Sequence, residues 1–251
     1  MKIGILGCGY NCAEDLNKRL DPWFQASVNN NLIFSFVSCP FEHFNLFDNS
    51  NTLNILNDLK QKKVIQYLYT SDSKFSESVS RNHALQPLLQ ESVDYIWLLD
   101  LSDEYYTLEN INKIINYVQN NDLYDWFSIN FKNYIFDGNE WVDNFCPPRI
   151  FKNTLQKSIK HFYWDNDILY TSNGVEITYK SLSECKIPKN VAHIKHMTWL
   201  HSNGKEKYEY QIKHFGECSY KWNYETEKLE FNEDFYRKIS IPLPLIHKDY
   251  D

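Results

Sequence analysis

The chain has 251 residues, a formal net charge of −7 and 43% hydrophobic residues, a balance typical of a globular protein with a sizeable core rather than a disordered chain. The negative charge argues against nucleic acid as a partner and against a basic membrane-binding patch, because both need clustered lysines and arginines. No apolar run approaches the ~20 residues of a transmembrane segment, and the start lacks a signal-peptide core, so we expect a cytoplasmic protein.

The first half of the chain alternates between strand-like and helix-like segments. Apolar runs that predict buried strands lie at 2–7, 32–37, 64–69 and 94–99. Apolar residues at helical spacing predict helices over 11–23, 53–59, 75–89 and 107–118. Asn11 and Thr107 are expected as N-caps, Pro22 as a sign of a nearby helix end, and Pro87 as a kink. This alternation predicts an α/β fold with a mostly parallel sheet and helices on both of its faces.

The second half has a different pattern. Residues 127–135 alternate between apolar and polar side chains, which predicts a half-buried strand, and Asp137-Gly138 predicts a hairpin turn after it. Short strand-like pieces and one helix around 205–215 follow. We therefore expect an α/β half over 1–136 and a smaller mixed half over 137–251, within one compact domain.

Three carboxylates follow the most apolar of the predicted strands, namely Asp100, Asp103 and Glu104. In open α/β sheets, ligands bind beyond the carboxyl ends of the strands. Closely spaced carboxylates repel each other unless a cation lies between them, and Mg²⁺ or Mn²⁺ takes such oxygen ligands and bridges to phosphates. The alternative is that Asp103 or Glu104 caps the next helix, but Thr107 is better placed for that role. The pattern favours a metal or ligand site.

Two further segments are expected at the same edge of the sheet. Arg81 and Asn82 lie in the helix before the acidic strand, where arginine offers donors to phosphate and asparagine can bond a sugar or a base, although a solvated helix face is the alternative. Gly7 and Gly9 follow the first strand and let a ligand approach the backbone closely. They half-match a dinucleotide fingerprint, but Val37-Ser38-Cys39 offers no acidic residue for a ribose.

Histidines and an aromatic, acidic segment stand out in the second half. His193 and His196 would point to opposite faces of a strand, so at most one of them serves a given metal site, and a hydrogen-bonded structural histidine is the alternative. Asp165 and Asp167 follow the aromatic run 162–164. Rings beside carboxylates are typical of a sugar site, where a carboxylate accepts a proton from a hydroxyl, and a polar turn after a strand is the alternative.

In order and position these segments resemble the GT-A fold glycosyltransferases of family 2. Gly9-Tyr10-Asn11 resembles the opening loop that contacts the nucleotide, and Arg81-Asn82 resembles the pair that precedes the Asp-x-Asp motif. Leu99-Asp100-Leu101-Ser102-Asp103-Glu104 resembles that motif itself. Pro148-Arg149-Ile150-Phe151 is similar to an Arg-x-Phe segment at the start of the acceptor half, and Ile194-Lys195-His196 to the late histidine of the metal site.

The resemblance implies a GT-A type fold, with a nucleotide-sugar-binding half over 1–136 and an acceptor-binding half over 137–251. It implies Mg²⁺ or Mn²⁺ held by Asp103 and His196, and Asp165 or Asp167 as the general base of an inverting reaction. The residues implied in nucleotide-sugar binding are Gly9, Tyr10, Asn11, Arg81, Asn82, Asp100 and Arg149. Two features depart from the family: two residues rather than one separate Asp100 from Asp103, and the acidic residue expected to face uracil after the second strand is missing.

The main hypothesis is therefore a glycosyltransferase of the hexosyltransferase type. It would move a sugar from a nucleotide-diphosphate donor, foremost a UDP-sugar, to a hydroxyl of a glycan or another acceptor. A non-catalytic protein that binds glycans or nucleotide sugars is the alternative from another class. A third hypothesis is a nicotinamide-dependent oxidoreductase built on Gly7-Cys8-Gly9.

Overall fold

The structure is a computed structural model of the chain. It describes residues 1–41, 48–135, 139–141, 146–153, 162–165, 168–171, 176–177, 183–196, 205, 208–209, 212–213, 220–234 and 246–247. The chain divides into two compact units, the first made of residues 1–130 and 146–194 and the second of residues 131–145 and 195–251. The division expected near residue 136 stays a prediction.

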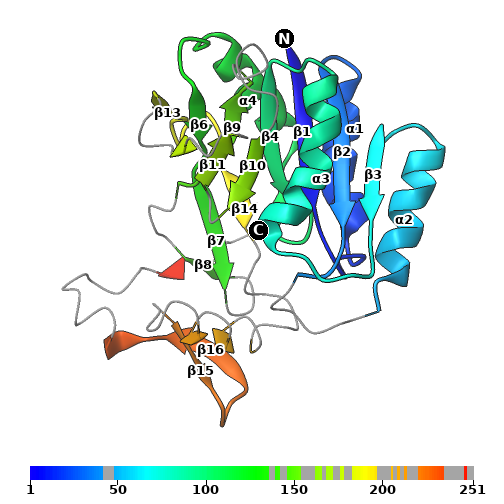
Figure 1. The fold of residues 1–251 in the computed structure, drawn as a ribbon. Helices are drawn as coiled ribbons and strands as arrows, with labels where there is room; N and C mark the ends of the chain where they lie inside the picture. Colours follow the sequence, from blue (N-terminus) through cyan, green and yellow to red (C-terminus); the bar gives the residue numbers. More distant parts are fainter. Residues whose placement is uncertain are drawn as a thin grey trace. The chain divides into compact units, whose positions relative to one another are not determined.

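A seven-stranded sheet with the order β13-β6-β9-β4-β1-β2-β3 forms the first unit (Figure 1). Its strands are β1 (Lys2–Cys8), β2 (Asn31–Ser38), β3 (Tyr67–Thr70), β4 (Tyr95–Asp100), β6 (Trp126–Ser128), β9 (Pro148–Lys152) and β13 (Glu184–Lys186). Strand β9 is antiparallel to its neighbours β4 and β6, whereas the other neighbouring strands pair in parallel. The predicted α/β fold with a mostly parallel sheet is thus confirmed, with one antiparallel strand inserted.

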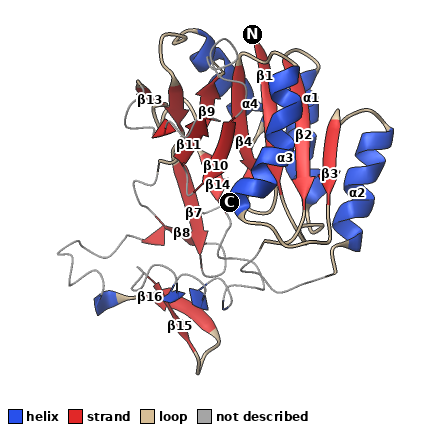
Figure 2. Cartoon of the chain, viewed as in Figure 1, coloured by secondary structure: helices blue, strands red, loops and turns tan. Residues whose placement is uncertain are grey.

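Helices cover both faces of this sheet (Figure 2). They are α1 (Leu16–Ser27), α2 (Ser50–Gln61), α3 (Glu77–Gln90) and α4 (Leu108–Gln119). Helix α3 lies against β1 and β2, and its Leu88 shares a buried cluster with Leu6 of β1 and Leu98 of β4. Successive strand residues face opposite sides, so Trp97 points to the other face. There its ring packs edge-on against Trp23 of α1, with 4.7 Å between the ring centroids.

The helix ends confirm one expectation and correct others. Thr107 caps α4, since its side chain accepts a hydrogen bond from the N–H of Asn110 at 3.1 Å. The expectation that Asn11 caps the first helix is wrong, because α1 begins only at Leu16 and Asn11 adopts a left-handed φ of 48° in the preceding loop. Pro22 and Pro87 lie inside α1 and α3, where burial of a helix face outweighs the loss of one backbone hydrogen bond.

Further strands of the first unit form a three-stranded antiparallel sheet of β10 (Phe162–Asp165), β11 (Ile168–Thr171) and β12 (Glu176–Ile177), and β10 lies beside α3. The short strand β5 (Glu104–Tyr105) follows β4, and β14 (Ile194–His196) begins where the first unit ends.

In the second unit, β8 (Asn139–Trp141) pairs with β7 (Phe131–Ile135) and with β17 (Ile246–His247), all antiparallel. The β7–β8 pairing is the expected hairpin, although its Asp137-Gly138 turn lies outside the described residues. Strands β15 (Tyr220–Asn223) and β16 (Lys228–Phe231) form a second hairpin. None of the helices in the described part of the chain is long and apolar enough to cross a membrane.

Candidate functional site

The carboxyl ends of β1, β2 and β4 meet at one edge of the central sheet. Cys8 at the end of β1 lies between Val37 of β2 and Asp100 of β4 in the strand register. The residues that follow β1 and β4 stay hydrogen-bonded to the neighbouring strand. The N–H of Gly9 donates to the carbonyl of Val37 at 3.1 Å, and the N–H of Leu101 donates to the carbonyl of Cys8 at 2.9 Å. The loop after β1 and the turn after β4 therefore form one continuous edge.

Gly9 is required by the closeness of these two segments. A Cβ atom at this position would lie 2.8 Å from the Cβ of Leu101 and 2.9 Å from the Sγ of Cys12, closer than real Cβ atoms come. Because the Leu101 Cβ sits directly on the backbone, it cannot rotate away. Gly9 is thus required for a close approach within the protein itself, and the approach of a ligand to its backbone stays a prediction.

The rest of the loop is anchored to helix α2. The N–H of Asn11 donates to Asn49 Oδ1 at 2.7 Å, and the N–H of Cys12 donates to Thr52 Oγ1 at 2.9 Å. Asn49 in turn donates to Ser38 Oγ at the end of β2 at 3.0 Å. Two predicted nucleotide-binding residues, Tyr10 and Asn11, thus lie on a loop that is fixed by hydrogen bonds at the sheet edge. Tyr10 is half-buried and Asn11 is exposed.

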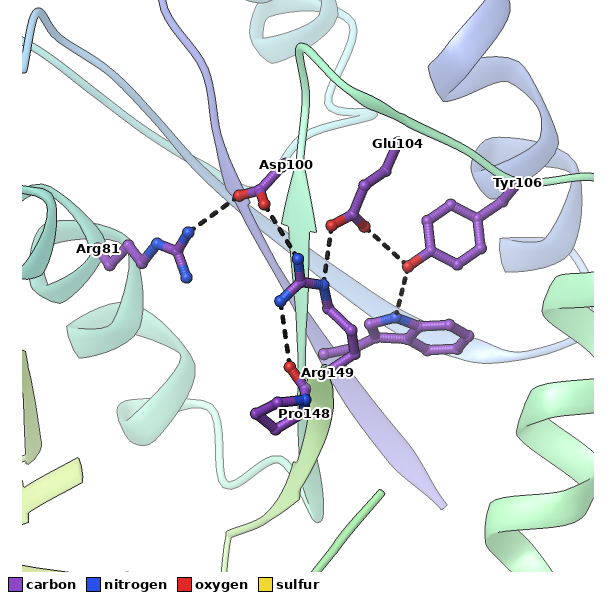
Figure 3. A network of polar contacts seen from close by, with 7 residues as sticks. Arg81, Asp100, Glu104, Tyr106, Pro148 and Arg149 are labelled. Atoms are coloured by element: carbon purple, nitrogen blue, oxygen red, sulfur yellow. Dashed lines mark hydrogen bonds and ion pairs between the residues drawn. The ribbon is translucent and has the colours of Figure 1, made fainter. Parts of the chain in front are cut away.

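Asp100 is held by two arginines at this edge (Figure 3). Arg81 Nη2 of α3 donates to Asp100 Oδ1 at 3.0 Å, and Arg149 Nη2 of β9 donates to Oδ2 at 3.2 Å. The side chain of Asp100 is 26% exposed, more than that of Arg81 at 7% or Arg149 at 12%. The structure thus brings three predicted site residues together, with the carboxylate as the most accessible of them.

Glu104 is the second carboxyl partner of Arg149. Arg149 Nε donates to Glu104 Oε1 at 2.8 Å, and the Tyr106 hydroxyl donates to Oε2 at 2.9 Å (Figure 3). Trp97 Nε1 donates to the same tyrosine oxygen at 3.3 Å. All four side chains lie in the first unit, and those of Glu104, Tyr106 and Trp97 are buried. Arg149 therefore bridges Glu104 in the core to Asp100 at the edge.

Burial dominates the electrostatics of this network. It raises the pKa of Glu104 to about 8, against the opposing effect of the Arg149 guanidinium. Burial also raises the pKa of Tyr106 well above its ordinary value. For Arg149, burial lowers the pKa, but the carboxylates of Glu104 and Asp100 outweigh it and leave the pKa raised. Arg149 is thus a permanent cation placed between two carboxyl groups.

Among the residues that the structure describes at this edge, two carboxylates are engaged by protein donors. Both oxygens of Asp100 accept from arginines, and those of Glu104 from Arg149 and Tyr106. Asp103 is nearly buried in the turn after β4, where its N–H donates to the Asp100 carbonyl at 3.2 Å. No group of three potential metal ligands occurs among the residues that the structure describes. Metal binding stays a prediction.

The remaining predicted residues are only partly placed. His196 ends β14 in the second unit, where its ring lies 4.8 Å from that of Phe131 between centroids, so its partnership with Asp103 stays a prediction. Asp165 is the last residue of β10, but nothing is described of its side chain, and Asp167 lies outside the described residues. Asn82 lies half-buried on α3, and its buried Oδ1 accepts no hydrogen bond from the part of the chain that is described.

Sequence reasoning singled out Glu104 but not its pairing with Arg149, and it missed two further residues that hold the edge together, Tyr106 and Arg19. A signal existed for Arg19, because it lies among Leu16, Leu20 and Trp23 on the apolar face of α1, where a charged residue is out of place. No comparable signal existed for Glu104, because its partner lies 45 positions away.

Comparisons with known proteins return structures only. No family model matches the chain, and no curated protein matches it. Among solved structures, residues 1–349 of TarS from S. aureus match with a TM-score of 0.49 and 15% identity, over 83% of this chain and 63% of that one. TarS 1–349 in complex with UDP matches with a TM-score of 0.44 and 16% identity, over 76% and 62%.

A third solved structure, a putative nucleotide-diphospho-sugar transferase from Desulfovibrio desulfuricans G20, matches with a TM-score of 0.37 and 12% identity, over 86% of this chain and 90% of that one. The chain thus spans less than two thirds of the TarS chains that it matches. The mixed α/β architecture agrees with the GT-A type that the sequence resembles.

Proposed function

We propose that the chain is a glycosyltransferase that moves a sugar from a nucleoside-diphosphate donor, foremost a UDP-sugar, to an acceptor hydroxyl such as that of a glycan. The observation that carries this proposal is the position of Asp100, whose half-buried carboxylate is held by Arg81 and Arg149 beside the loop of Gly9. A ligand at a carboxyl edge of this kind would meet a rigid acceptor flanked by two guanidinium groups.

The chemistry of transfer suits such an edge. The acceptor oxygen attacks the anomeric carbon, the bond from that carbon to the donor phosphate oxygen breaks, and the nucleoside diphosphate leaves with the electron pair. Negative charge therefore grows on the diphosphate, where preorganised guanidinium groups lower the barrier because they need no reorganisation. We propose that Asp100 accepts hydrogen bonds from the donor, and that Asn82 supplies its buried Oδ1 as a further acceptor.

The acceptor proton needs a base, and Asp165 or Asp167 remains the proposed one for an inverting reaction. Support comes from strand β10, which ends at Asp165 and lies beside α3, the helix that carries Arg81. We expect Asp165→Asn or Asp167→Asn to lower kcat by about 100-fold or more with little change in KM, because only proton transfer is removed. Equal activity of both variants and the wild type would exclude both residues as the base.

The proposed metal is Mg²⁺ or Mn²⁺ held by Asp103 and His196, and a bound cation would neutralise charge on the diphosphate. A metal chelator tests it. We expect loss of transfer on chelation and its return with Mn²⁺, and a similar loss in Asp103→Ala. Full transfer in the presence of a chelator would exclude the metal without excluding the transferase.

A ligand screen tests the function as a whole. Ligands that bind only the folded state raise its melting temperature, so we expect UDP-sugars to raise Tm above the values with GDP-sugars or NAD. Transfer or hydrolysis of the same donors then separates an enzyme from a binding protein. Asp100→Ala should lower kcat/KM by about 100-fold, since it leaves two arginines without their shared partner. Glu91→Ala, which removes a charge at the opposite edge of the sheet, is the matched control.

One observation favours a second candidate, a non-catalytic protein that binds nucleotide sugars. The carboxylate of the acidic motif is engaged by Arg81 and Arg149, and the described residues gather no three potential metal ligands. A binding protein needs the arginines but no metal. UDP-sugar binding without turnover at any metal concentration would favour this candidate over the enzyme.

A further inference from the structure

Arg19 is a buried cation that the proposed chemistry does not use. It lies on the inner face of α1 and is 4% exposed. Its guanidinium points to the loop after β1, where Nη2 donates to the carbonyls of Cys12 at 2.7 Å and Glu14 at 2.6 Å. Its Nη1 donates to the hydroxyl of Tyr105 at 2.9 Å, and its Cζ lies 5.2 Å from the centroid of the tyrosine ring.

The partners of this arginine are unusual for a buried charge. Buried cations are ordinarily paired with carboxylates, because removing a charge from water is costly. Arg149 follows this rule with Glu104 and Asp100. None of the ion pairs formed by the described residues includes Arg19, and its Nε is buried without a hydrogen-bond partner. Burial of Arg19 therefore does not gain the compensation that a salt bridge would give.

The loop that Arg19 holds has an unusual backbone. Asn11 and Asp15 adopt left-handed φ values of 48° and 56°, which residues other than glycine rarely adopt. Such a loop keeps its shape only when its polar groups are held. Asn49, the residue before α2, and Thr52 of α2 accept from its N–H groups, while Arg19 of α1 donates to its carbonyls. The loop 9–15 is thus fixed from two helices.

Tyr105 extends this arrangement to the acidic segment. It neighbours Glu104, which anchors Arg149 and through it Asp100. The two adjacent residues of strand β5 thus contact different arginines. Glu104 contacts Arg149, and Tyr105 contacts Arg19. Arg19 therefore ties the loop that carries Tyr10 and Asn11 to the segment that carries Asp100.

We infer that Arg19 is a positioning residue: it holds the loop 9–15 in its left-handed shape and in register with the segment 100–105, and so sets the geometry in which a nucleoside diphosphate is bound. The loop-holding part stands on the contacts above, and the ligand part rests on the proposed function. The inference predicts that removal of the Arg19 guanidinium loosens the loop first and weakens the binding of UDP as a consequence.

The experiment compares four variants of the full chain. Arg19→Met removes the charge and its donors at similar length, Arg19→Lys keeps the charge but not the planar fork, and Tyr105→Phe removes only the hydroxyl acceptor. Leu20→Val is the matched control, since Leu20 is fully buried on the same helix and its shortening lowers stability without touching the loop. Amide hydrogen exchange of a peptide covering 9–15 reports the loop, and calorimetric titration with UDP reports the ligand site.

In Arg19→Met we expect the 9–15 amides to exchange about tenfold faster, while exchange of β1 and β4 is unchanged. We expect Kd for UDP to rise by about tenfold in the same variant. Both values should be intermediate in Arg19→Lys and equal to those of the wild type in Leu20→Val. Should turnover be present, KM is expected to rise while kcat changes little. If Arg19→Met fails to fold, Arg19→Lys and Tyr105→Phe carry the same comparison with smaller shifts.

Loop exchange in the Arg19 variants that equals that of Leu20→Val would overturn the inference. Faster loop exchange with an unchanged Kd for UDP would overturn its ligand part. A wild type that binds neither UDP nor any UDP-sugar would refute the proposed function instead, and the exchange measurement would still decide whether Arg19 holds the loop.

Discussion

The two edges of the central sheet carry ion pairs of different kinds. At the amino edge, Lys2 Nζ pairs with Glu91 Oε2 at 2.7 Å, and the two side chains are 26% and 32% exposed. At the carboxyl edge, Arg149 pairs with a fully buried Glu104. Exposed pairs contribute little to stability, while a buried pair is costly to form and damaging to break. A buried pair is therefore weak evidence for stability, and the proposed function assigns the charges beside Gly9 and Asp100 to ligand binding instead.

The largest expected effect comes from breaking the buried pair. We expect Glu104→Ala to lower the free energy of unfolding by about 3–5 kcal/mol above about pH 8, where Glu104 is ionised, because Arg149 is left as a largely buried cation with one partner fewer. Unfolding in urea measures the loss. Glu104→Gln keeps the volume and a hydrogen-bond acceptor and should lose clearly less. A loss below about 1 kcal/mol in Glu104→Ala is the value typical of an exposed pair. It would show that the ion pairs of the two edges do not differ in their contribution to stability.

Two glycine substitutions sharpen the comparison at intermediate cost. Gly9→Ala should lower the free energy of unfolding by about 1–3 kcal/mol and weaken UDP binding, because its Cβ would meet the immobile Cβ of Leu101 at 2.8 Å. Gly4→Ala is the control, since its Cβ would meet Cδ1 of Leu88 at 2.9 Å, the end of a side chain that can rotate. Equal UDP affinity of the two variants would show that the close approach at Gly9 serves packing alone.

The smallest effect is expected at the amino edge and depends on pH. Hydrogen bonds from Lys2 and from the Tyr67 hydroxyl hold the pKa of Glu91 below its ordinary 4.5 in the folded state. A lowered carboxyl pKa adds stability above the unfolded pKa, and this gain is lost as the pH falls through the folded pKa. The Tm advantage of the wild type over Glu91→Gln should therefore be small at pH 7 and be lost as the pH falls through the lowered pKa of Glu91. An advantage that grows in acid would contradict this assignment.

The sequence predicted the sheet well and the site in part. The apolar runs of β1, β2 and β4 and the Thr107 cap are local signals, and the structure confirms them. That Arg81 would reach the edge where Asp100 ends β4 was also predicted, and the two side chains pair at 3.0 Å. These inferences succeeded because hydrophobic periodicity and strand direction are written in neighbouring residues.

Other features could not be found in this way. The pairing of Arg149 with Glu104 depends on the insertion of β9 antiparallel between β4 and β6, which no local pattern announces. The acidic turn suggested a metal ion between carboxylates, which stays a prediction. The contacts of Glu104 and Asp100 with the Arg149 guanidinium were not foreseen. Asn11 looked like a helix cap because helix caps and left-handed loop positions favour the same residue types. The tertiary structure distinguishes the two, since the N–H of Asn11 donates to Asn49 and α1 begins only at Leu16.

The sequence by itself determined which segments become strands and helices, that the sheet is mostly parallel, and that polar residues gather where β1 and β4 end. Only the tertiary structure decided which charges meet there: Asp100 with two arginines, Glu104 with Arg149 and Tyr106, and Arg19 with backbone carbonyls. The physical reason is that backbone patterns act over a few residues, whereas the compensation of a buried charge depends on side chains brought together from distant strands and helices.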